Sequence, residues 1–129
     1  MAVDMDMPVL VVDDYKTMLR IVRNLLIQLG FKNIDEAMDG DTATAMIRDK
    51  KYGLIMSDWN MQPVTGLDLL KRVRADEKTK NTPFVMVTAE AKTENVVVAK
   101  GAGVNNYIIK PFNLNVLKTK LSAVLGALP

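Results

Sequence analysis

Five polar residues follow short apolar runs at four separate places along the chain. They are Asp13, Asp14, Asp58, Thr88 and Lys110. Each alone has an ordinary structural explanation, since loop aspartates cap helices or form turns, threonine suits a strand, and lysine is usually solvated. Carboxylates gathered at one place are different, because they repel one another and raise their own pKa values unless a cation neutralises them. As a group, these residues predict a cation-binding site.

The chemistry that suits this group is phosphoryl transfer. A site made of oxygen ligands favours Mg²⁺, which binds through one or two carboxylates together with phosphate oxygens. Lys110 would add a second positive charge, and Thr88 would add a hydroxyl donor for the phosphoryl oxygens. One carboxylate would then act as the nucleophile, as in other aspartyl-phosphate chemistry. Asp58 is the predicted nucleophile because it stands alone at the end of the central apolar run.

Composition narrows the choice of chemistry. The chain has no cysteine and no histidine, which excludes Ser-His-Asp and Cys-His nucleophiles and the commonest transition-metal ligands. The 17 basic residues against 15 acidic ones give a net charge of only +2, far from the cationic surface of a nucleic-acid-binding protein. No apolar run approaches the roughly 18 residues of a membrane span. We therefore expect a cytoplasmic protein that binds neither nucleic acid nor membranes.

The elements that would position the polar group are short strands alternating with helices. Apolar runs predict strands at 10–12, 34–37, 54–57, 84–87 and 107–109. Helical spacing predicts helices at 17–29, at 41–48, after Gly66 and after Asn113, and a weaker helix around the β-branched run 96–98. This alternation predicts a doubly wound α/β fold, with a parallel sheet covered by helices on both faces. The carboxyl ends of its strands meet at one edge, where the polar residues fall.

Capping residues and apolar faces give finer predictions. Asp41, Thr65 and Asn113 are predicted N-caps of the second, third and fifth helices. Gly30 is predicted to end the first helix. The inward faces of the third and fifth helices are predicted to carry Leu67, Leu70, Val73, Val116, Leu117, Leu121, Val124 and Leu125. Because no repeat or linker is present, we expect one domain over residues 1–129.

Several segments resemble the receiver domains of bacterial response regulators, in the same order along the chain. They are Val9 to Tyr15, Ile21 to Leu26, Ser57 to Met61, Val87 to Lys92 and Lys110 to Phe112. Each segment is moderately specific, and together they are highly specific, most of all for the single-domain members of chemotaxis systems. The resemblance implies a receiver of two-component signalling with a flavodoxin-like sheet and the strand order 2-1-3-4-5.

The resemblance also implies roles for the acidic residues. Asp13, Asp14 and Asp58 would hold Mg²⁺ together with the backbone carbonyl of Asn60. Asp58 would accept the phosphoryl group from a histidine kinase, and a phosphatase is a further candidate partner. The chain would carry out its own phosphorylation and dephosphorylation chemistry at Asp58, which makes it a phosphoacceptor switch and not an enzyme in the ordinary sense.

The switch itself would run from the phosphoryl group to an aromatic residue. Thr88 and Lys110 would contact the phosphoryl oxygens, and the ring of Tyr107 would turn inward when Thr88 moves. The Lys110–Pro111 bond would be cis. The output would be the binding of a target protein by the monomer, with the flagellar motor switch as the first candidate. A phosphate sink, or the regulation of a non-flagellar partner, is the alternative.

The target surface that the resemblance implies comprises the fourth helix, the fifth strand and the fifth helix. Its residues here are Lys92, Val96, Lys100, Val104, Tyr107 and Lys120, and Lys118 adds to the basic group. A lysine cluster is most often a solvated face. Beside a switch aromatic, however, it favours an acidic peptide as the partner.

The loop after Asp58 departs from the family pattern. Receivers usually read Met-Pro-x-Met-Asp-Gly there, whereas this chain reads Met-Gln-Pro-Val-Thr-Gly over residues 61–66. The proline comes one place later, and a threonine replaces the acid. Because proline fixes φ, the path of the loop and the position of the Asn60 carbonyl are expected to change, and the metal affinity with them.

Two other classes of protein share parts of this pattern. A phosphatase of the haloacid dehalogenase type also uses an aspartate nucleophile on a doubly wound sheet, but it needs a second aspartate two residues later, where this chain has Asn60. A flavodoxin-like cofactor binder needs Ser, Thr or Gly in the first loop to bind a phosphate, which Asp13 and Asp14 would repel without a metal. Both classes fit the sequence less well than a receiver does.

Overall fold

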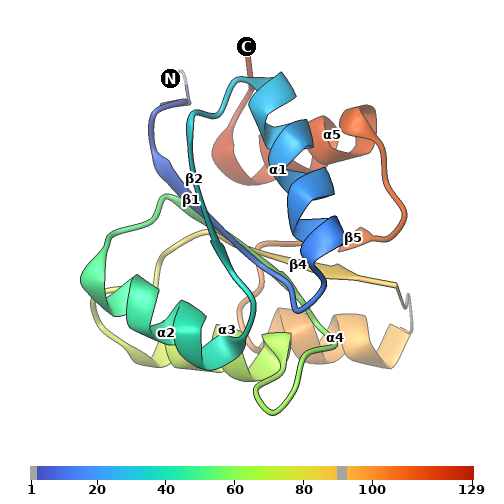
Figure 1. The fold of residues 1–129 in the computed structure, drawn as a ribbon. Helices are drawn as coiled ribbons and strands as arrows, with labels where there is room; N and C mark the ends of the chain where they lie inside the picture. The colour runs from blue at the N-terminus through green and yellow to red at the C-terminus, as the bar shows by residue number, and fades with distance from the viewer. Residues whose placement is uncertain (1–2, 90–92) are drawn as a thin grey trace.

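The computed structural model describes residues 3–89 and 93–129. It contains a five-stranded parallel sheet in the order β2-β1-β3-β4-β5 (Figure 1), which confirms the predicted doubly wound fold and strand order. The strands are β1 (Pro8–Val12), β2 (Asn33–Ala37), β3 (Leu54–Asp58), β4 (Phe84–Thr88) and β5 (Asn106–Ile109). The helices are α1 (Lys16–Leu29), α2 (Gly40–Asp49), α3 (Gly66–Ala75), α4 (Thr93–Gly101) and α5 (Leu114–Leu125).

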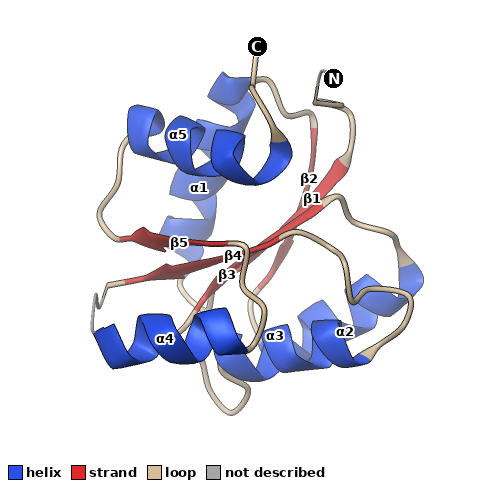
Figure 2. Ribbon diagram, turned by 180° about the vertical axis from the view of Figure 1, so that it is seen from behind, coloured by secondary structure: helices blue, strands red, loops and turns tan. Residues whose placement is uncertain are grey.

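The sheet is covered on both faces. Helices α1 and α5 lie on one face, and α2, α3 and α4 lie on the other (Figure 2). Alternate residues of β1 enter the two layers, since Val9 and Val11 pack with α1 and α5 while Leu10 and Val12 pack with the opposite helices. Because both of their faces are buried, the central strands β1, β3 and β4 are mostly apolar, whereas the edge strand β2 carries Asn33, Asp35 and Glu36. Over residues 3–89 and 93–129, no helix is long and apolar enough to cross a membrane.

Helix α2 begins earlier than the sequence predicts. Its N-cap is Asp39, whose carboxylate accepts hydrogen bonds from the backbone N–H of Thr42 at 2.7 Å and from its hydroxyl at 3.0 Å. The predicted cap, Asp41, lies instead in the first turn and pairs with Arg72 of α3. The prediction of Asp41 was therefore wrong. The earlier start is possible because Gly40 is buried where a Cβ atom would clash.

The other predicted caps are confirmed. At the start of α3, Thr65 and Asp68 form a capping box, in which each side chain accepts a hydrogen bond from the backbone N–H of the other residue. At the start of α5, Asn113 accepts a hydrogen bond from the backbone N–H of Val116 at 2.9 Å. Gly30 ends α1 with a φ of 111°, in the left-handed region that favours glycine.

The predicted inward face of α5 is correct except at its first residue. Leu117 and Leu121 are buried, and Val124 and Leu125 are partly buried against the same core. Val116 is 38% exposed, because it lies roughly 100° around the helix from Leu117. The buried residues of α3 are Gly66, Leu69, Leu70 and Val73, and Leu67 is partly buried.

Candidate functional site

The parallel register brings the polar residues to one edge of the sheet. The last residues of β1, β3, β4 and β5 lie within one position of those on the neighbouring strand. Asp58 and Thr88 are the last residues of β3 and β4, Asp13 directly follows β1, and Lys110 directly follows β5. Residues far apart in the sequence therefore lie side by side at the carboxyl end of the sheet.

Three carboxylates form the centre of this group. One oxygen each from Asp13, Asp14 and Asp58 lies within 4.8 Å of the others. Asp13 and Asp58 are only 4% and 6% exposed, whereas Asp14 is exposed. The backbone N–H of Tyr15 donates a hydrogen bond to Asp13 Oδ1 at 3.0 Å and so holds that carboxylate in place. The site thus offers a cluster of oxygen ligands that is open to solvent on the side of Asp14.

Lys110 joins two of these carboxylates. Its ammonium group donates hydrogen bonds to Asp58 Oδ1 at 3.0 Å and to Asp13 Oδ2 at 3.1 Å. Its backbone N–H also donates to the carbonyl oxygen of Thr88 at 2.7 Å, which ties the start of the loop to β4. A single ammonium among three carboxylates leaves negative charge in excess. This donor set therefore fits a hard divalent cation.

The electrostatics of the site follow from burial. Burial raises the pKa of Asp13 above its usual value, although the Tyr15 N–H and the Lys110 ammonium oppose the shift. Burial alone would lower the pKa of Lys110, but the hydrogen bonds and negative charges of Asp58 and Asp13 outweigh it and raise that pKa. Lys110 is therefore firmly protonated, and Asp13 ionises less readily than an exposed aspartate.

The remaining predicted site residues flank the cluster. Thr88 is buried at the end of β4, with 2% exposure. Asn60 is exposed in the loop after β3, and its carbonyl remains a predicted ligand. That loop is held by backbone hydrogen bonds from Trp59 to Val87 at 3.0 Å and from Gly66 to Trp59 at 3.0 Å.

Two peptide bonds near the site are cis. The Lys110–Pro111 bond is cis, as predicted. The Gln62–Pro63 bond, at the shifted proline of the loop after β3, is also cis.

Tyr107 lies inward and contacts an aromatic residue of the acidic edge. Its side chain is buried, and its ring and the Trp59 ring make a T-shaped contact with a centroid distance of 6.2 Å and an interplanar angle of 65°. Trp59 directly follows Asp58. This contact could not be predicted from the sequence, because β4 separates β3 from β5 in the sheet and no residue pattern relates Trp59 to Tyr107.

The residues of the predicted target surface differ in how far they are exposed. Lys100 and Lys118 are exposed, but Val96 and Val104 pack partly against the core, and Lys120 is half-buried. Lys92 lies outside the described residues. The exposed apolar residues on these elements are Val97, Val98, Ile109 and Val116. Sequence reasoning missed the exposed valines of α4, because a run of adjacent valines shows no single apolar face.

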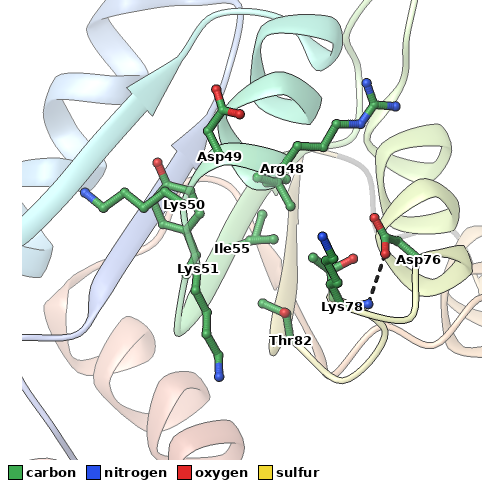
Figure 3. A pocket seen from close by; sticks show the side chains of 11 residues that line it. Arg48, Asp49, Lys50, Lys51, Ile55, Asp76, Lys78 and Thr82 are labelled. Atoms are coloured by element: carbon green, nitrogen blue, oxygen red, sulfur yellow. Dashed lines mark hydrogen bonds between the residues drawn. The ribbon is translucent and has the colours of Figure 1, made fainter.

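A cavity of about 580 Å³ lies away from the acidic cluster. It is lined from the end of α2, the start of β3 and the loop after α3, with Arg48, Lys51, Asp76 and Lys78 among its residues (Figure 3). Within its wall, the backbone N–H of Lys78 donates to Asp76 Oδ1 at 3.0 Å. None of its lining residues belongs to the carboxylate cluster, so the candidate site is an open edge of the sheet and not this cavity.

Comparison with known families identifies the class of protein. Residues 9–122 match the response regulator receiver domain. The chain belongs to the response regulator receiver family. Its similarity to CheY proteins identifies it as a CheY-type receiver of two-component signalling.

The relatives are chemotaxis proteins of similar length. The chain is 50% identical to the chemotaxis protein CheY of Pseudomonas aeruginosa over 118 residues, which cover 92% of this chain and 95% of that protein. It is also 50% identical to CheY-3 of Vibrio cholerae over 123 residues, which cover 95% of each chain.

Solved structures share the fold. CheY4 of Vibrio cholerae is 33% identical and superimposes with a TM-score of 0.87, covering 93% of this chain and 99% of that chain. A receiver domain of a sensor histidine kinase from Pseudomonas aeruginosa superimposes with a TM-score of 0.84, covering 95% of this chain and 99% of that chain. At 24% identity, the second comparison supports the fold alone. That structure has a magnesium ion coordinated in its active-site cleft.

Proposed function

We propose that this chain is a phosphorylation-activated switch of a chemotaxis-type two-component system, in which Asp58 accepts a phosphoryl group from a histidine kinase. The observation that carries the proposal is the position of Lys110, whose ammonium group lies 3.0 Å from Asp58 and 3.1 Å from Asp13. It holds a positive charge against the proposed nucleophile, where a phosphoryl oxygen would arrive.

Mg²⁺ is the proposed cofactor. Asp13, Asp14 and Asp58 would hold it, together with the carbonyl of Asn60, and the excess of carboxylates over ammonium groups at this edge supports this choice. When bound, the ion would supply positive charge that offsets the charge of the phosphoryl oxygens.

Asp58 supplies the nucleophilic oxygen in the proposed reaction. A new bond forms between phosphorus and a carboxylate oxygen of Asp58 while the bond from phosphorus to the histidine nitrogen of the donor breaks, and the electron pair leaves with the donor. The Lys110 ammonium, which contacts Asp58 in the structure, would donate to one phosphoryl oxygen, and the Thr88 hydroxyl would donate to another. Attack by water later releases phosphate and restores Asp58.

The output is a change in the surface formed by α4, β5 and α5. Thr88 moves toward the phosphoryl group, and Tyr107 occupies the space beside it. Because Tyr107 already lies inward in the structure, phosphorylation would increase the population of an arrangement that the chain reaches without it. The monomer would then bind its target in the cytoplasm, with the flagellar motor switch as the first candidate, and a phosphatase would reset it.

Modification by a small phosphodonor tests the acceptor. The wild-type protein, incubated with acetyl phosphate and Mg²⁺, should gain one phosphoryl group at Asp58, as measured by intact-mass and peptide mass spectrometry. Asp58→Asn should gain none. Phosphate that persists in Asp58→Asn, on a residue outside the cluster, would show that another group is the nucleophile.

Binding of the motor switch protein tests the output. Its affinity for the wild type should rise on phosphorylation by a factor of about 5–150, the range of ordinary allosteric coupling. Thr88→Ala should accept phosphate but lose most of this gain. An affinity that does not depend on phosphate would favour the alternative, a receiver that drains phosphate or serves a non-flagellar partner.

A further inference from the structure

Arg74, in the last turn of α3, connects two segments that lie apart in the sequence. Its half-buried guanidinium donates three hydrogen bonds: from Nη1 to the carbonyl oxygen of Thr82 at 2.7 Å, from Nη2 to Asn105 Oδ1 at 2.8 Å, and from Nε to the carbonyl oxygen of Gly103 at 2.9 Å. Thr82 precedes β4, whereas Gly103 and Asn105 form the turn between α4 and β5. One side chain therefore ties this turn to α3 and to the approach to β4.

The acceptors of Arg74 are all neutral. They are two backbone carbonyls and one side-chain amide, and among the ion pairs of residues 3–89 and 93–129 none includes Arg74. Burial lowers the pKa of its guanidinium. Hydrogen bonds from a charged donor are roughly twice as strong as neutral ones. The charge of Arg74 thus holds backbone in place and does not pair with an acid.

Further contacts hold the turn between α4 and β5 in one conformation. Asn105 Oδ1 also accepts a hydrogen bond from the backbone N–H of Phe84 at 2.8 Å, and the Asn105 N–H donates to the Phe84 carbonyl at 2.9 Å. Gly103 has a φ of 94°, and a Cβ atom there would lie 3.0 Å from Arg74 Nε. Only a glycine suits both this backbone conformation and the close approach of the guanidinium.

The same turn fixes one end of α4. The N–H of Gly103 donates to the Lys100 carbonyl at 3.1 Å, and the N–H of Val104 donates to the Ala99 carbonyl at 3.1 Å. Along residues 94–101, whose exposure the structure describes, Ala99 is the buried side chain, whereas Val97 is 63% exposed. With β-branched residues and little burial, the body of α4 has low local stability, while its carboxyl end is held firmly.

We propose that Arg74 is a positioning residue that anchors the carboxyl end of α4, so that this end is the fixed pivot about which the helix shifts when Asp58 is phosphorylated. The inference rests on the proposed function, because a shift of α4 would be part of the proposed change in the surface formed by α4, β5 and α5. The carbonyl of Thr82 that Arg74 binds lies just before the start of β4, whereas Thr88 and the acidic cluster lie at the other end of that strand. Arg74 therefore acts on the output surface and not on the acceptor chemistry.

Amide hydrogen exchange of Arg74→Gln, compared with Arg72→Gln, tests the anchor. Arg72 is the matched control, since it lies in the same helix and loses the same charge but pairs with Asp41 instead. In the unphosphorylated protein, the amides of residues 103–105 should exchange at least about tenfold faster in Arg74→Gln, from the loss of hydrogen bonds to a charged group. Arg72→Gln should match the wild type. Equal protection of this turn in both variants would overturn the proposal.

The phosphorylated proteins test the pivot. With acetyl phosphate and Mg²⁺, wild type and Arg72→Gln should show the same change in exchange along α4, and Arg74→Gln should show a change at least about threefold smaller while its Asp58 takes up phosphate normally. A full response of α4 in Arg74→Gln would contradict the pivot. If the amides of β1 in Arg74→Gln also exchanged faster than in the wild type by the same factor, the variant would be generally destabilised, and this too would contradict the pivot.

Arg74→Lys separates charge from geometry. It keeps the positive charge but has a single nitrogen for three acceptors, so it should behave like Arg74→Gln. Restoration of wild-type behaviour by lysine would overturn the proposed role of the guanidinium. A wild type that takes up no phosphate would refute the proposed function instead, and the unphosphorylated comparison would still decide whether Arg74 anchors the turn.

Discussion

At the scale of single residues, the candidate site depends on Lys110. Its ammonium contacts Asp13 and Asp58 together, and the negative charges around it raise its pKa despite its burial. The charge is therefore fixed in position before any phosphoryl group arrives. Preorganised charge of this kind stabilises a transition state without reorganisation at the moment of reaction.

Removing this charge should slow the acceptor chemistry. Lys110→Ala is expected to react with acetyl phosphate about 100-fold more slowly than the wild type at saturating Mg²⁺, because one preorganised donor to the phosphoryl oxygens is lost. The measurement is the rate of mass increase. Lys32→Ala, in which a 73% exposed lysine side chain far along the sequence is removed, is the control and should react normally. A wild-type rate in Lys110→Ala would exclude the ammonium from the reaction.

At the scale of elements, the start of α3 supports the end of β3. Thr65 caps the helix, and the N–H of Gly66 donates to the Trp59 carbonyl at 3.0 Å. A Cβ atom on Gly66 would overlap the Asp58 carbonyl oxygen and approach the Met86 sulfur to 2.8 Å. The helix thus touches the backbone of the proposed phosphoacceptor, and only a glycine allows this approach.

A methyl group at this contact should be costly. Gly66→Ala is expected to lower the free energy of unfolding by about 1–3 kcal/mol, the usual effect of overpacking, and to weaken Mg²⁺ binding by displacing the loop after Asp58. Urea unfolding and a Mg²⁺ titration followed by Trp59 fluorescence measure the two effects. Gly101→Ala is the control. It has no heavy atom within 4 Å of the added Cβ, so it should be neutral or stabilise by up to about 1 kcal/mol. Equal stability of both variants would contradict the close contact.

At the scale of the whole molecule, the buried acidic edge lowers the stability of the folded chain when no cation is bound. Burial raises the pKa of Asp13, so the folded protein keeps this proton at a pH where the unfolded chain has lost it. Stability therefore falls as the pH rises from the usual aspartate pKa through the raised one. A bound cation would offset this loss, since a ligand that binds only the folded state stabilises it.

Replacing Asp13 by a neutral residue should raise the stability of the folded protein without metal and lower the stability that it gains from Mg²⁺. In EDTA, Asp13→Asn is expected to be more stable than the wild type near neutral pH, and this advantage should shrink as the pH falls and the wild-type carboxyl takes up its proton. With Mg²⁺ at 100 times its Kd, the wild type should gain about 2.7 kcal/mol, and Asp13→Asn should gain much less.

Thermal and urea unfolding, with EDTA or Mg²⁺ at several pH values, measure both effects. Asp49→Asn is the control, because Asp49 is exposed and lies outside the cluster. It should leave the Mg²⁺-dependent gain unchanged. If Asp13→Asn were destabilising at neutral pH in EDTA, the carboxylate would be a structural group and not part of a strained acidic site.

The sequence was informative wherever one physical rule decided the outcome. Parallel strands must end at one edge, so the meeting of Asp13, Asp58 and Lys110 could be expected from their places after apolar runs. Thr65 and Asn113 could be recognised as caps because their side chains suit that position.

The sequence was insufficient where several tertiary contacts compete. Asp39 and Asp41 have the same side chain and could both cap α2. The helix begins after Asp39 because Gly40 packs closely against Val64. The contact between Trp59 and Tyr107 depends on how strands and loops from distant parts of the chain are arranged. Neither the choice of Asp39 as the cap nor the contact between Trp59 and Tyr107 can be predicted from neighbouring residues in the sequence.

The Lys110–Asp13 contact also determines when, during translation, the acidic site can be completed. It joins residues 97 positions apart, and Lys110 follows β5, the last strand to leave the ribosome. A nascent chain that ends before β5 contains Asp13, Asp14 and Asp58 but not Lys110. Phosphoryl acceptance, as proposed for Asp58, would therefore wait until Lys110 has been synthesised. A copy truncated before β5 would then accept phosphoryl groups slowly and would compete poorly with longer copies for the phosphodonor.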